Sequence, residues 1–223
     1  MIDVIAQGKF GKPVSYVAPK RVLTLWNDEG INDADTAVLR KVSAECQAPF
    51  DKQTQEEIQA LIDSFISRDD ASGLAAPQIG INKRIIIFRN KTQESGKKKL
   101  TLADCDVLIN PRITQTRGDK QAAAEGCLSC PHIQIEVERF PEIKIRALNA
   151  QGGKITKRYL DYTARVVQHE IDHLDGVLYV DRVQGQTHPK DKLKELREQL
   201  RAQQPAVACT PRFGGRHRDE ILL

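Results

Sequence analysis

The sequence predicts an α+β fold in which antiparallel sheets pack around a central helix. Three observations support this: an amphipathic helical segment at 54–66, short strands with period-two alternation between 84 and 159, and a second helical segment at 164–175. Helices before and after a block of strands are typical of α+β proteins, since parallel sheets need crossover helices between successive strands. A chain of 223 residues is long enough for one domain with a sizeable hydrophobic core and for extensions at its ends.

The composition is ordinary for a soluble globular protein and argues against several classes. Charged residues make up 29% of the chain, the mean hydropathy is −0.45, and no apolar run approaches membrane-spanning length. A net charge of +4 does not require a polyanionic partner, so we expect neither a membrane nor a specific nucleic-acid partner. Five cysteines at irregular spacing indicate a reducing compartment with free or metal-bound thiols.

The chain divides into three parts. Residues 1–32 are expected to form an N-terminal extension, 33–188 the main domain, and 189–223 a C-terminal helix at 190–203 followed by an arginine-containing flexible tail. A short helix is expected within 33–45, with Val38, Leu39 and Val42 turned inward. Thr54-Gln55-Glu56-Glu57 matches a capping box and predicts the start of a helix, whose apolar residues are Ile58, Leu61, Ile62, Phe65 and Ile66.

Strand signals fill the middle of the chain. Strands are expected at 84–89, at 107–109 ending at Asn110-Pro111, and at 112–117, with a polar hairpin loop at 90–99. Period-two alternation predicts strands at 132–139 and 142–148, with Ile143, Ile145 and Leu148 on one face of the second. Two more are expected at 154–159 and at 177–180.

The motif H-E-x-x-H occurs at His169, Glu170 and His173. On a helix the two histidines share one face and can bind one divalent metal, and Glu170 lies where it can move a proton on and off a metal-bound water. The flanks support a helix: Ala164, Val167, Ile171 and Leu174 form an apolar stripe, Asp161 suits an N-cap and Gly176 a C-terminal stop. The motif lacks a third ligand, and the third ligand decides the chemistry.

Candidate third ligands lie close together upstream, at Cys127, Cys130 and His132. The C-x-x-C pair also allows a structural zinc site, but such a site normally needs a second pair, and Cys46, Cys105 and Cys209 are isolated. A thioredoxin-like redox pair is a further alternative, although no βαβ pattern surrounds it. The glycine before Cys127 and the downstream H-E-x-x-H favour Cys127 as a metal ligand.

A third stretch, Ala71 to Gly80, is rich in small residues that let the backbone approach another group closely. Turn chemistry explains Gly73, Pro77 and Gly80. It does not explain Gln78, whose amide could direct a hydrogen-bond donor into a cleft.

Three motifs therefore occur in order: G-L-A-A-P-Q at 73–78, E-G-C-L-S at 125–129 and Q-H-E-I-D-H-L at 168–174. Together they resemble the peptide deformylase family over roughly residues 35–182. The resemblance implies that family's compact α+β fold, with one metal ion held by Cys127, His169 and His173. It also implies that the chain removes the formyl group from the N-terminal formyl-methionine of new polypeptides.

The resemblance assigns the remaining roles. Glu170 takes the proton of a metal-bound water, whose pKa falls to about 7 in the best-known zinc enzymes, and returns it to the leaving amine. Gln78 and the backbone N–H of Leu128 stabilise the oxyanion, and Gly73 lets the substrate backbone approach. Ferrous iron is the expected physiological metal, with zinc, nickel or cobalt as alternatives in a preparation.

The expected substrates are N-formyl-methionyl peptides, and the basic last helix resembles the place where some family members contact the ribosome. Formyl-methionine synthesis belongs to bacteria and organelles, so we expect the bacterial cytoplasm, with an organellar address as the alternative. The chain departs from the family at Ala71 and Ser72, where a glycine and an apolar residue are usual. This departure bears on the shape and affinity of the substrate pocket and not on metal binding.

Two other functions stay open. A zincin-type endopeptidase shares H-E-x-x-H but takes its third ligand downstream, where the candidates are His188 and His217. A catalytically weak homologue acting as a binding module is suggested by Ala71, Ser72 and the two extensions. The presence of ligands, base and oxyanion donors favours the enzyme.

Overall fold

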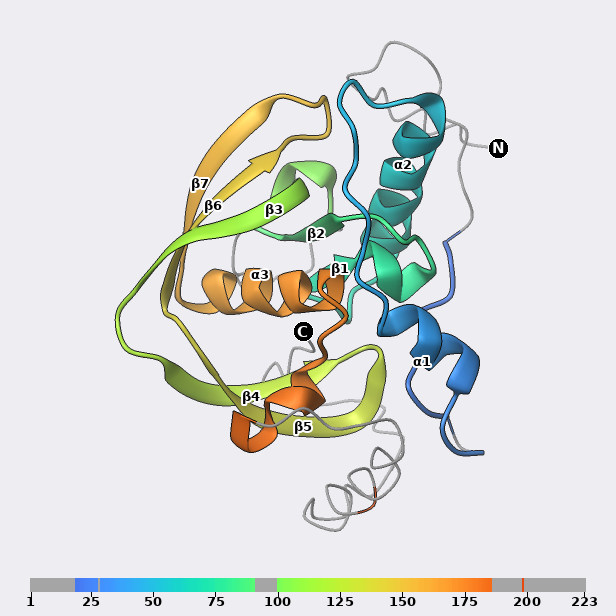
Figure 1. Ribbon diagram of the computed structural model, residues 1–223, viewed down its shortest axis with the longest axis vertical. Coiled ribbons are helices and arrows are strands. Elements are labelled where there is room, and N and C mark those ends of the chain that lie inside the picture. The colour runs from blue at the N-terminus through green and yellow to red at the C-terminus, as the bar shows by residue number, and fades with distance from the viewer. Residues whose placement is uncertain (1–18, 28, 91–99, 186–197, 199–223) are drawn as a thin grey trace, which may run out of the picture.

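The computed structural model describes residues 19–27, 29–90, 100–185 and 198. Residues 1–18 of the extension, most of the hairpin loop at 90–99, and all of the last helix and tail except residue 198 lie outside these ranges. Figure 1 shows the described elements gathered around one helix, α3 (Asp161–Leu174), which lies between two sheets. Within the described residues, no helix has the length and apolarity needed to cross a membrane.

Both sheets are antiparallel, as the sequence predicted. The larger has the order β1-β2-β3-β6-β7, formed by β1 (Gly73–Ala75), β2 (Ile85–Arg89), β3 (Cys105–Arg117), β6 (Glu142–Leu148) and β7 (Lys154–Leu160). The smaller is a hairpin of β4 (Gln121–Cys127) and β5 (Cys130–Arg139). Helices α1 (Asp33–Leu39) and α2 (Lys52–Ile66) precede the sheets, and 3₁₀ helices cover Ala76–Ile79, Leu102–Asp104 and Tyr179–Gly185.

The apolar stripe predicted for the central helix packs against the larger sheet. The buried residues on the two sides of this contact are Ala164, Val167, Ile171 and Leu174 of α3, and Ile86, Phe88, Ile143 and Ile145 of β2 and β6. Burial of this apolar surface, at about 25 cal/mol per Å², fixes the rotation of α3 about its axis. The opposite face of the helix, with both histidines, is thereby turned towards the hairpin β4–β5.

Three helix boundaries differ from the prediction. Helix α2 begins before Thr54, because the carboxylate of Asp51 is the N-cap and accepts the Thr54 N–H at 2.7 Å. Asp161 is not the N-cap of α3: Leu160 holds that place, and Asp161 takes a left-handed φ of 46° that turns the chain from β7 into the helix. Helix α1 ends at Leu39, so Val42 lies beyond it and is 64% exposed.

Several strand predictions were wrong in extent. Residues 107–109 and 112–117 form one strand, β3, because Asn110, with φ 51°, bends the chain while pairing continues on both sides of it. Residues 177–180 form no strand, since the Asp181 carboxylate accepts the Leu178 N–H and the chain enters a 3₁₀ helix. Strict alternation on β6 places Ala147, not Leu148, on the face of Ile143 and Ile145. Strands β1 and β4 were not predicted from the sequence.

Part of the predicted N-terminal extension belongs to the core. Leu25 and Trp26 are buried in a cluster with α1 and the hairpin. The Leu23 N–H donates to Gln78 O at 2.7 Å, and the Leu25 N–H donates to Ser129 O at 2.8 Å. This segment therefore holds together the two loops that carry Gln78 and Ser129.

Candidate metal centre

The three predicted metal ligands meet between α3 and the hairpin. His169 and His173 lie one helical turn apart, are almost fully buried, and have ring centroids 5.0 Å apart. Cys127 ends β4, where a register shift and a two-residue turn bring its Sγ to 3.3 Å from His173 Nε2. The ligand atoms of the three residues all lie within 4.8 Å of one another.

The chemistry of this cluster fits a divalent metal ion. Within the described residues, the buried Nε2 of His169 has no hydrogen-bond partner, which is costly for a polar atom unless something else binds it. Burial opposes ionisation of Cys127, but a hydrogen bond from Cys130 and the charge of His173 outweigh it and hold the pKa of Cys127 well below its usual value. The thiolate is the form that binds metal, and three protein ligands are typical of catalytic sites that keep one position open.

The other predicted ligand candidates do not join the cluster. Cys130 pairs with Cys127 across the turn, but burial raises the pKa of its thiol well above the usual value, so it stays protonated. His132 is exposed on the hairpin. Cys46 and Cys105 are free thiols in the core beside α2, so no second pair completes a structural zinc site within the described part of the chain. The endopeptidase candidates, His188 and His217, lie outside that part.

Glu170 lies beside the first histidine and is fully buried. Neither of its carboxylate oxygens has a hydrogen-bond partner among the described residues. Burial disfavours the anion and raises the pKa of Glu170 to about 7, so the group can both accept and return a proton near neutral pH. Gly73 faces it closely: a Cβ at this position would lie 2.8 Å from the Glu170 Cδ, so glycine leaves the space that the carboxyl occupies.

Gln78 presents an oriented donor to the cluster. Its Oε1 accepts the Ala75 N–H at 2.8 Å, which leaves Nε2 directed at Ser129 Oγ (3.2 Å) and Cys127 Sγ (3.7 Å). The 3₁₀ helix Ala76–Ile79 places the side chain there. Leu128 follows the predicted ligand Cys127 in the turn of the hairpin and packs partly buried against the core beside α2.

Glu125 also belongs to the site, although its role was not predicted from the sequence. Its Oε2 lies 3.0 Å from His169 Nδ1, and both Arg139 and Arg165 donate to the same carboxylate. Burial opposes its ionisation, but the hydrogen bonds from His169 and Arg139 outweigh burial and lower the pKa of Glu125 to about 2. An anion that accepts from Nδ1 orients the ring so that Nε2 faces the metal site. Its place within E-G-C-L-S, two residues before Cys127, was the signal that could have identified it.

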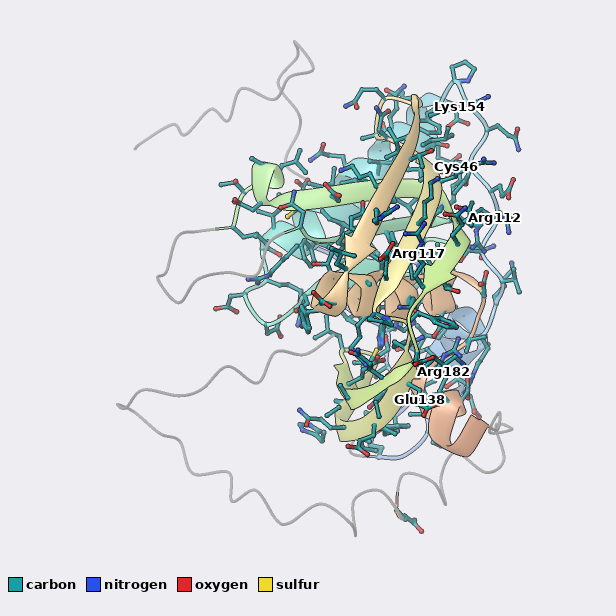
Figure 2. The ribbon with its side chains drawn as sticks, turned by 90° about the vertical axis from the view of Figure 1, so that its left-hand side faces the viewer. Cys46, Arg112, Arg117, Glu138, Lys154 and Arg182 are labelled. Carbon is teal, nitrogen blue, oxygen red and sulfur yellow. The ribbon has the colours of Figure 1, made fainter. Side chains whose placement is uncertain are left out.

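A buried arginine joins this carboxylate to the rest of α3. Arg139 on β5 bonds to Glu125 and, at 2.5 Å, to Asp172 of α3. Asp172 also accepts from Arg182 at 2.6 Å. Figure 2 shows Arg182 and Glu138 at the hairpin end of the molecule, with Lys154 at the opposite end. The network therefore fastens the 3₁₀ helix and the hairpin to the helix that carries the histidines.

Comparison with known proteins agrees with this geometry. Residues 29–188 match the family model described as Polypeptide deformylase. The chain belongs to this family. A peptide deformylase of Pseudothermotoga lettingae is 40% identical over 146 residues, which are 66% of this chain and 77% of that protein. A peptide deformylase of Desulforudis audaxviator is 42% identical over 122 residues, or 55% of this chain and 72% of that protein.

Two solved structures show the same likeness. The class I type b peptide deformylase from Acinetobacter baumannii, bound to Met-Ala-Ser, has a TM-score of 0.61 at 28% identity over 75% of this chain and 99% of that one. The peptide deformylase from Synechococcus elongatus, in complex with actinonin, has a TM-score of 0.61 at 31% identity over 88% and 91%. The predicted family and α+β fold are thus confirmed. The chain is a metal-dependent hydrolase that removes the formyl group from nascent polypeptides and releases formate.

Proposed function

We propose that Glu170 acts first as general base and then as general acid in hydrolysis of the formyl amide. The observation that carries this proposal is the convergence of Cys127, His169 and His173 beside a buried carboxyl whose oxygens have no partner in the described chain. A divalent ion held by these residues would act as a Lewis acid and would lower the pKa of a water to about 7. Glu170, whose pKa is also about 7, takes the proton of the attacking water and passes it to the leaving amine nitrogen.

Gln78 and Leu128 are the proposed donors to the formyl oxygen as it gains negative charge. The Gln78 amide nitrogen lies 3.7 Å from the sulfur of Cys127, and the Leu128 N–H belongs to the next residue after that ligand. The bond from the Ala75 N–H fixes the orientation of Gln78 in advance. Preorganised donors of this kind are worth about 10²–10³ in kcat.

The peptide substrate is proposed to lie along β1, which is the end strand of the larger sheet. Main-chain hydrogen bonds to an end strand do not depend on the side chains of the added peptide, which suits an enzyme that acts on many nascent chains. Gly73 in this strand then serves the peptide backbone on one side and the Glu170 carboxyl on the other.

Fe²⁺ is the metal that we propose for the living cell, with Zn²⁺, Ni²⁺ and Co²⁺ as substitutes. Two imidazoles and one thiolate accommodate all four ions. The test is formate release from formyl-Met-Ala-Ser by protein loaded with each ion in the absence of oxygen. We expect turnover with iron, nickel or cobalt, and no turnover with any of them would contradict the proposal.

Variants separate the proposed roles. Glu170→Ala is expected to keep its metal and lose turnover, whereas Cys127→Ala loses the metal and His188→Ala keeps it. Metal loss in His188→Ala, with metal retained in Cys127→Ala, would support the endopeptidase instead. Tight binding of a formyl-peptide without turnover in the wild type would support the binding module.

The bacterial cytoplasm is the proposed place of the reaction, because the relatives described above are bacterial and formylated chains emerge there from ribosomes. A ribosome contact through the basic segment 190–203 is part of the same proposal. Sedimentation of the full chain with ribosomes, compared with a chain that ends at residue 189, tests it. Equal sedimentation of the two chains would contradict the contact.

A further inference from the structure

Ser72 and Tyr162 form a hydrogen-bonded pair next to the proposed site. The Ser72 Oγ and the Tyr162 hydroxyl are 2.8 Å apart. Ser72 directly precedes Gly73, the residue that faces the Glu170 carboxyl. Tyr162 precedes His169 by seven positions on α3, which is about two helical turns, so both side chains lie on the same face of the helix. The pair thus bridges the start of β1 and the helix of the histidines.

The pair stands where this face of α3 passes from solvent into the interior. Tyr162 is 38% exposed, whereas Ser72, His169 and Glu170 are buried. The pair therefore lies at the more exposed end of the helix that carries His169 and Glu170.

The pair also has a hydrogen-bond donor to spare. Two hydroxyl groups bring two O–H donors, and the bond between them uses one. Neither oxygen makes a second hydrogen bond within the described residues. The remaining O–H can therefore donate to an acceptor on the substrate. An apolar wall would instead leave such an acceptor desolvated and unpaired, which is why apolar pockets disfavour it.

We infer that the Ser72–Tyr162 pair is a specificity-determining element that lets the enzyme accept formyl-peptides whose first side chain carries an acceptor oxygen, such as methionine sulfoxide. The inference rests on the proposed position of the formyl carbon beside Glu170. The first Cα is two covalent bonds, about 2.5 Å, from that carbon, and Ser72 is one residue, about 3.8 Å between Cα atoms, from Gly73. On this position the first side chain starts close to Gly73, the residue next to Ser72.

The test compares three tripeptides that share Ala-Ser and differ in the first residue: formyl-methionine, formyl-norleucine and formyl-methionine sulfoxide. The ratio of kcat/KM for sulfoxide over methionine is measured in the wild type, Ser72→Ala, Tyr162→Phe and the double variant. We expect each single change to lower this ratio about threefold to tenfold, the range for one hydrogen bond. The double variant falls no further, because the two hydroxyls act as a unit. The norleucine-to-methionine ratio stays constant.

A binding measurement gives a readout that does not depend on turnover. The dissociation constants of the unformylated products, Met-Ala-Ser and its sulfoxide, are expected to shift by the same factor in calorimetry. Tyr159→Phe is the matched control, because it also removes a hydroxyl hydrogen bond, 2.7 Å to Asp106, but in the larger sheet. Its selectivity ratio should equal that of the wild type.

An unchanged ratio in both single variants overturns the inference. So does an equal rise of KM for all three peptides, since that result would assign the spare donor to the peptide backbone. If Ser72→Ala does not fold, Tyr162→Phe decides, because it removes one oxygen from a partly exposed ring. Failure of the wild type to release formate from formyl-Met-Ala-Ser contradicts the proposed function, and is thereby distinguished from failure of this inference.

Discussion

Two buried glutamates show how surroundings, and not residue type, set the chemistry of the site. Burial raises the pKa of Glu170 to about 7, because no donor among the described residues compensates the loss of water. Glu125 is also buried, but the hydrogen bonds from His169 and Arg139 outweigh burial and lower the pKa of Glu125 to about 2. One carboxyl can therefore exchange protons near neutral pH, and the other is a permanent anion that orients a ligand.

Replacement of Glu125 by glutamine tests the second role. The amide keeps the shape of the side chain but removes the charge that faces His169 Nδ1, so we expect the affinity for metal to fall about 10–100-fold. Competition with a chromogenic chelator measures it. The matched control is Glu136→Gln on β5, where the side chain is exposed. Equal metal affinity in the two variants would contradict an orienting role for Glu125.

Gly73→Ala tests the space that Glu170 requires. A Cβ at this position would lie 2.8 Å from the Glu170 Cδ, so the carboxyl must move away from its place beside the ligands. Because a displacement of about 1 Å can cost about 100-fold in rate, we expect kcat to fall by that order with metal content unchanged. Steady-state kinetics and metal analysis check both quantities. The control is Gly153→Ala, in the turn between β6 and β7, which should keep wild-type kcat. Wild-type kcat in Gly73→Ala as well would contradict the proposal that Glu170 needs the space at Gly73.

At the level of elements, prediction from sequence succeeded where the pattern was local. Period-two alternation gave the strand 142–148 with both its ends, and the 3.6-residue stripe gave the buried face of α3. It failed for β4, because the run Gln121-Ala122-Ala123-Ala124 has little strand propensity and is a strand only through its pairing with β5. It failed at 177–180, because the bond from the Leu178 N–H to Asp181 makes a turn from a strand-like run.

For the candidate site too, local motifs were predictable and roles that depend on tertiary contacts were not. Cys127, His169, His173 and Gln78 each lie in a motif, and the fold brings all four together as expected. The role of Glu125 was not visible, because it depends on two arginines from β5 and α3 that only the tertiary structure places around the carboxylate. The Ser72–Tyr162 bond joins residues ninety positions apart, so no local pattern could reveal it.

Arg139 links the hairpin to α3, because its guanidinium bonds to Glu125 of β4 and to Asp172 of α3. Arg139→Ala leaves Glu125 and Asp172 buried with fewer partners, and breaking a buried ion pair costs about 3–5 kcal/mol. Since Arg165 and Arg182 remain, we expect a loss near the lower end, about 3 kcal/mol, in urea unfolding. Arg117 at the end of β3, labelled in Figure 2, has a side chain that is 61% exposed. Its replacement by alanine should change the free energy of unfolding by less than about 0.5 kcal/mol. Similar losses for the two variants would refute the buried network.

Asp106 provides a pH-dependent contribution to the larger sheet. Burial opposes its ionisation, but bonds from Lys157 and Tyr159 of β7, each 2.7 Å, outweigh burial and lower the pKa of Asp106 below its usual 3.8. A carboxyl with a lowered pKa stabilises the fold above its unfolded-state pKa, and this stabilisation is lost as the pH falls below that value. Asp106→Asn should therefore cost about 1 kcal/mol at pH 7 and progressively less below about pH 4. Urea unfolding of both proteins at pH 7, 5 and 3 measures this difference. A stability difference between wild type and Asp106→Asn that grows as the pH falls would contradict the prediction.

Across the whole molecule, the metal centre lies at the meeting point of three separately packed parts. The larger sheet fixes α3 and its histidines, the hairpin supplies Cys127 and Glu125, and the segment before α1 bonds to the loops of Gln78 and Ser129. The three motifs of the sequence lie on different elements: 73–78 on β1 and the 3₁₀ helix after it, 125–129 on the hairpin and 168–174 on α3. The relative placement of the motifs therefore depends on contacts that are remote in the chain, and the segment at 22–26 makes contacts to two of the three parts.

Trp26 contributes to these contacts and offers a test of whether residues 22–26 stabilise the fold. The residue is 1% exposed, and its Nε1–H donates to Pro131 O at 3.1 Å. Pro131 lies close to the hairpin turn at 128–129, which follows Cys127. Trp26→Ala should lower the free energy of unfolding by about 3–5 kcal/mol, as for other buried aromatic truncations. Trp26→Phe keeps most of the packing and should lose only about 1 kcal/mol with the hydrogen bond.

Measurement of turnover distinguishes the contribution of residues 22–26 to stability from their effect on the positions of the loops at Gln78 and Ser129. Because the neighbouring Leu23 and Leu25 N–H groups hold the backbone at Gln78 and Ser129, loosening the segment should lower kcat even where Trp26→Ala is still folded. The experiment is formate release by both variants, with urea unfolding of the same samples. Val42→Ala, at a side chain that is 64% exposed, is the control and should match the wild type in both measurements. If Trp26→Ala also matches the wild type, residues 22–26 are an appendage, as the sequence had suggested, and the two active-site loops hold their positions without them.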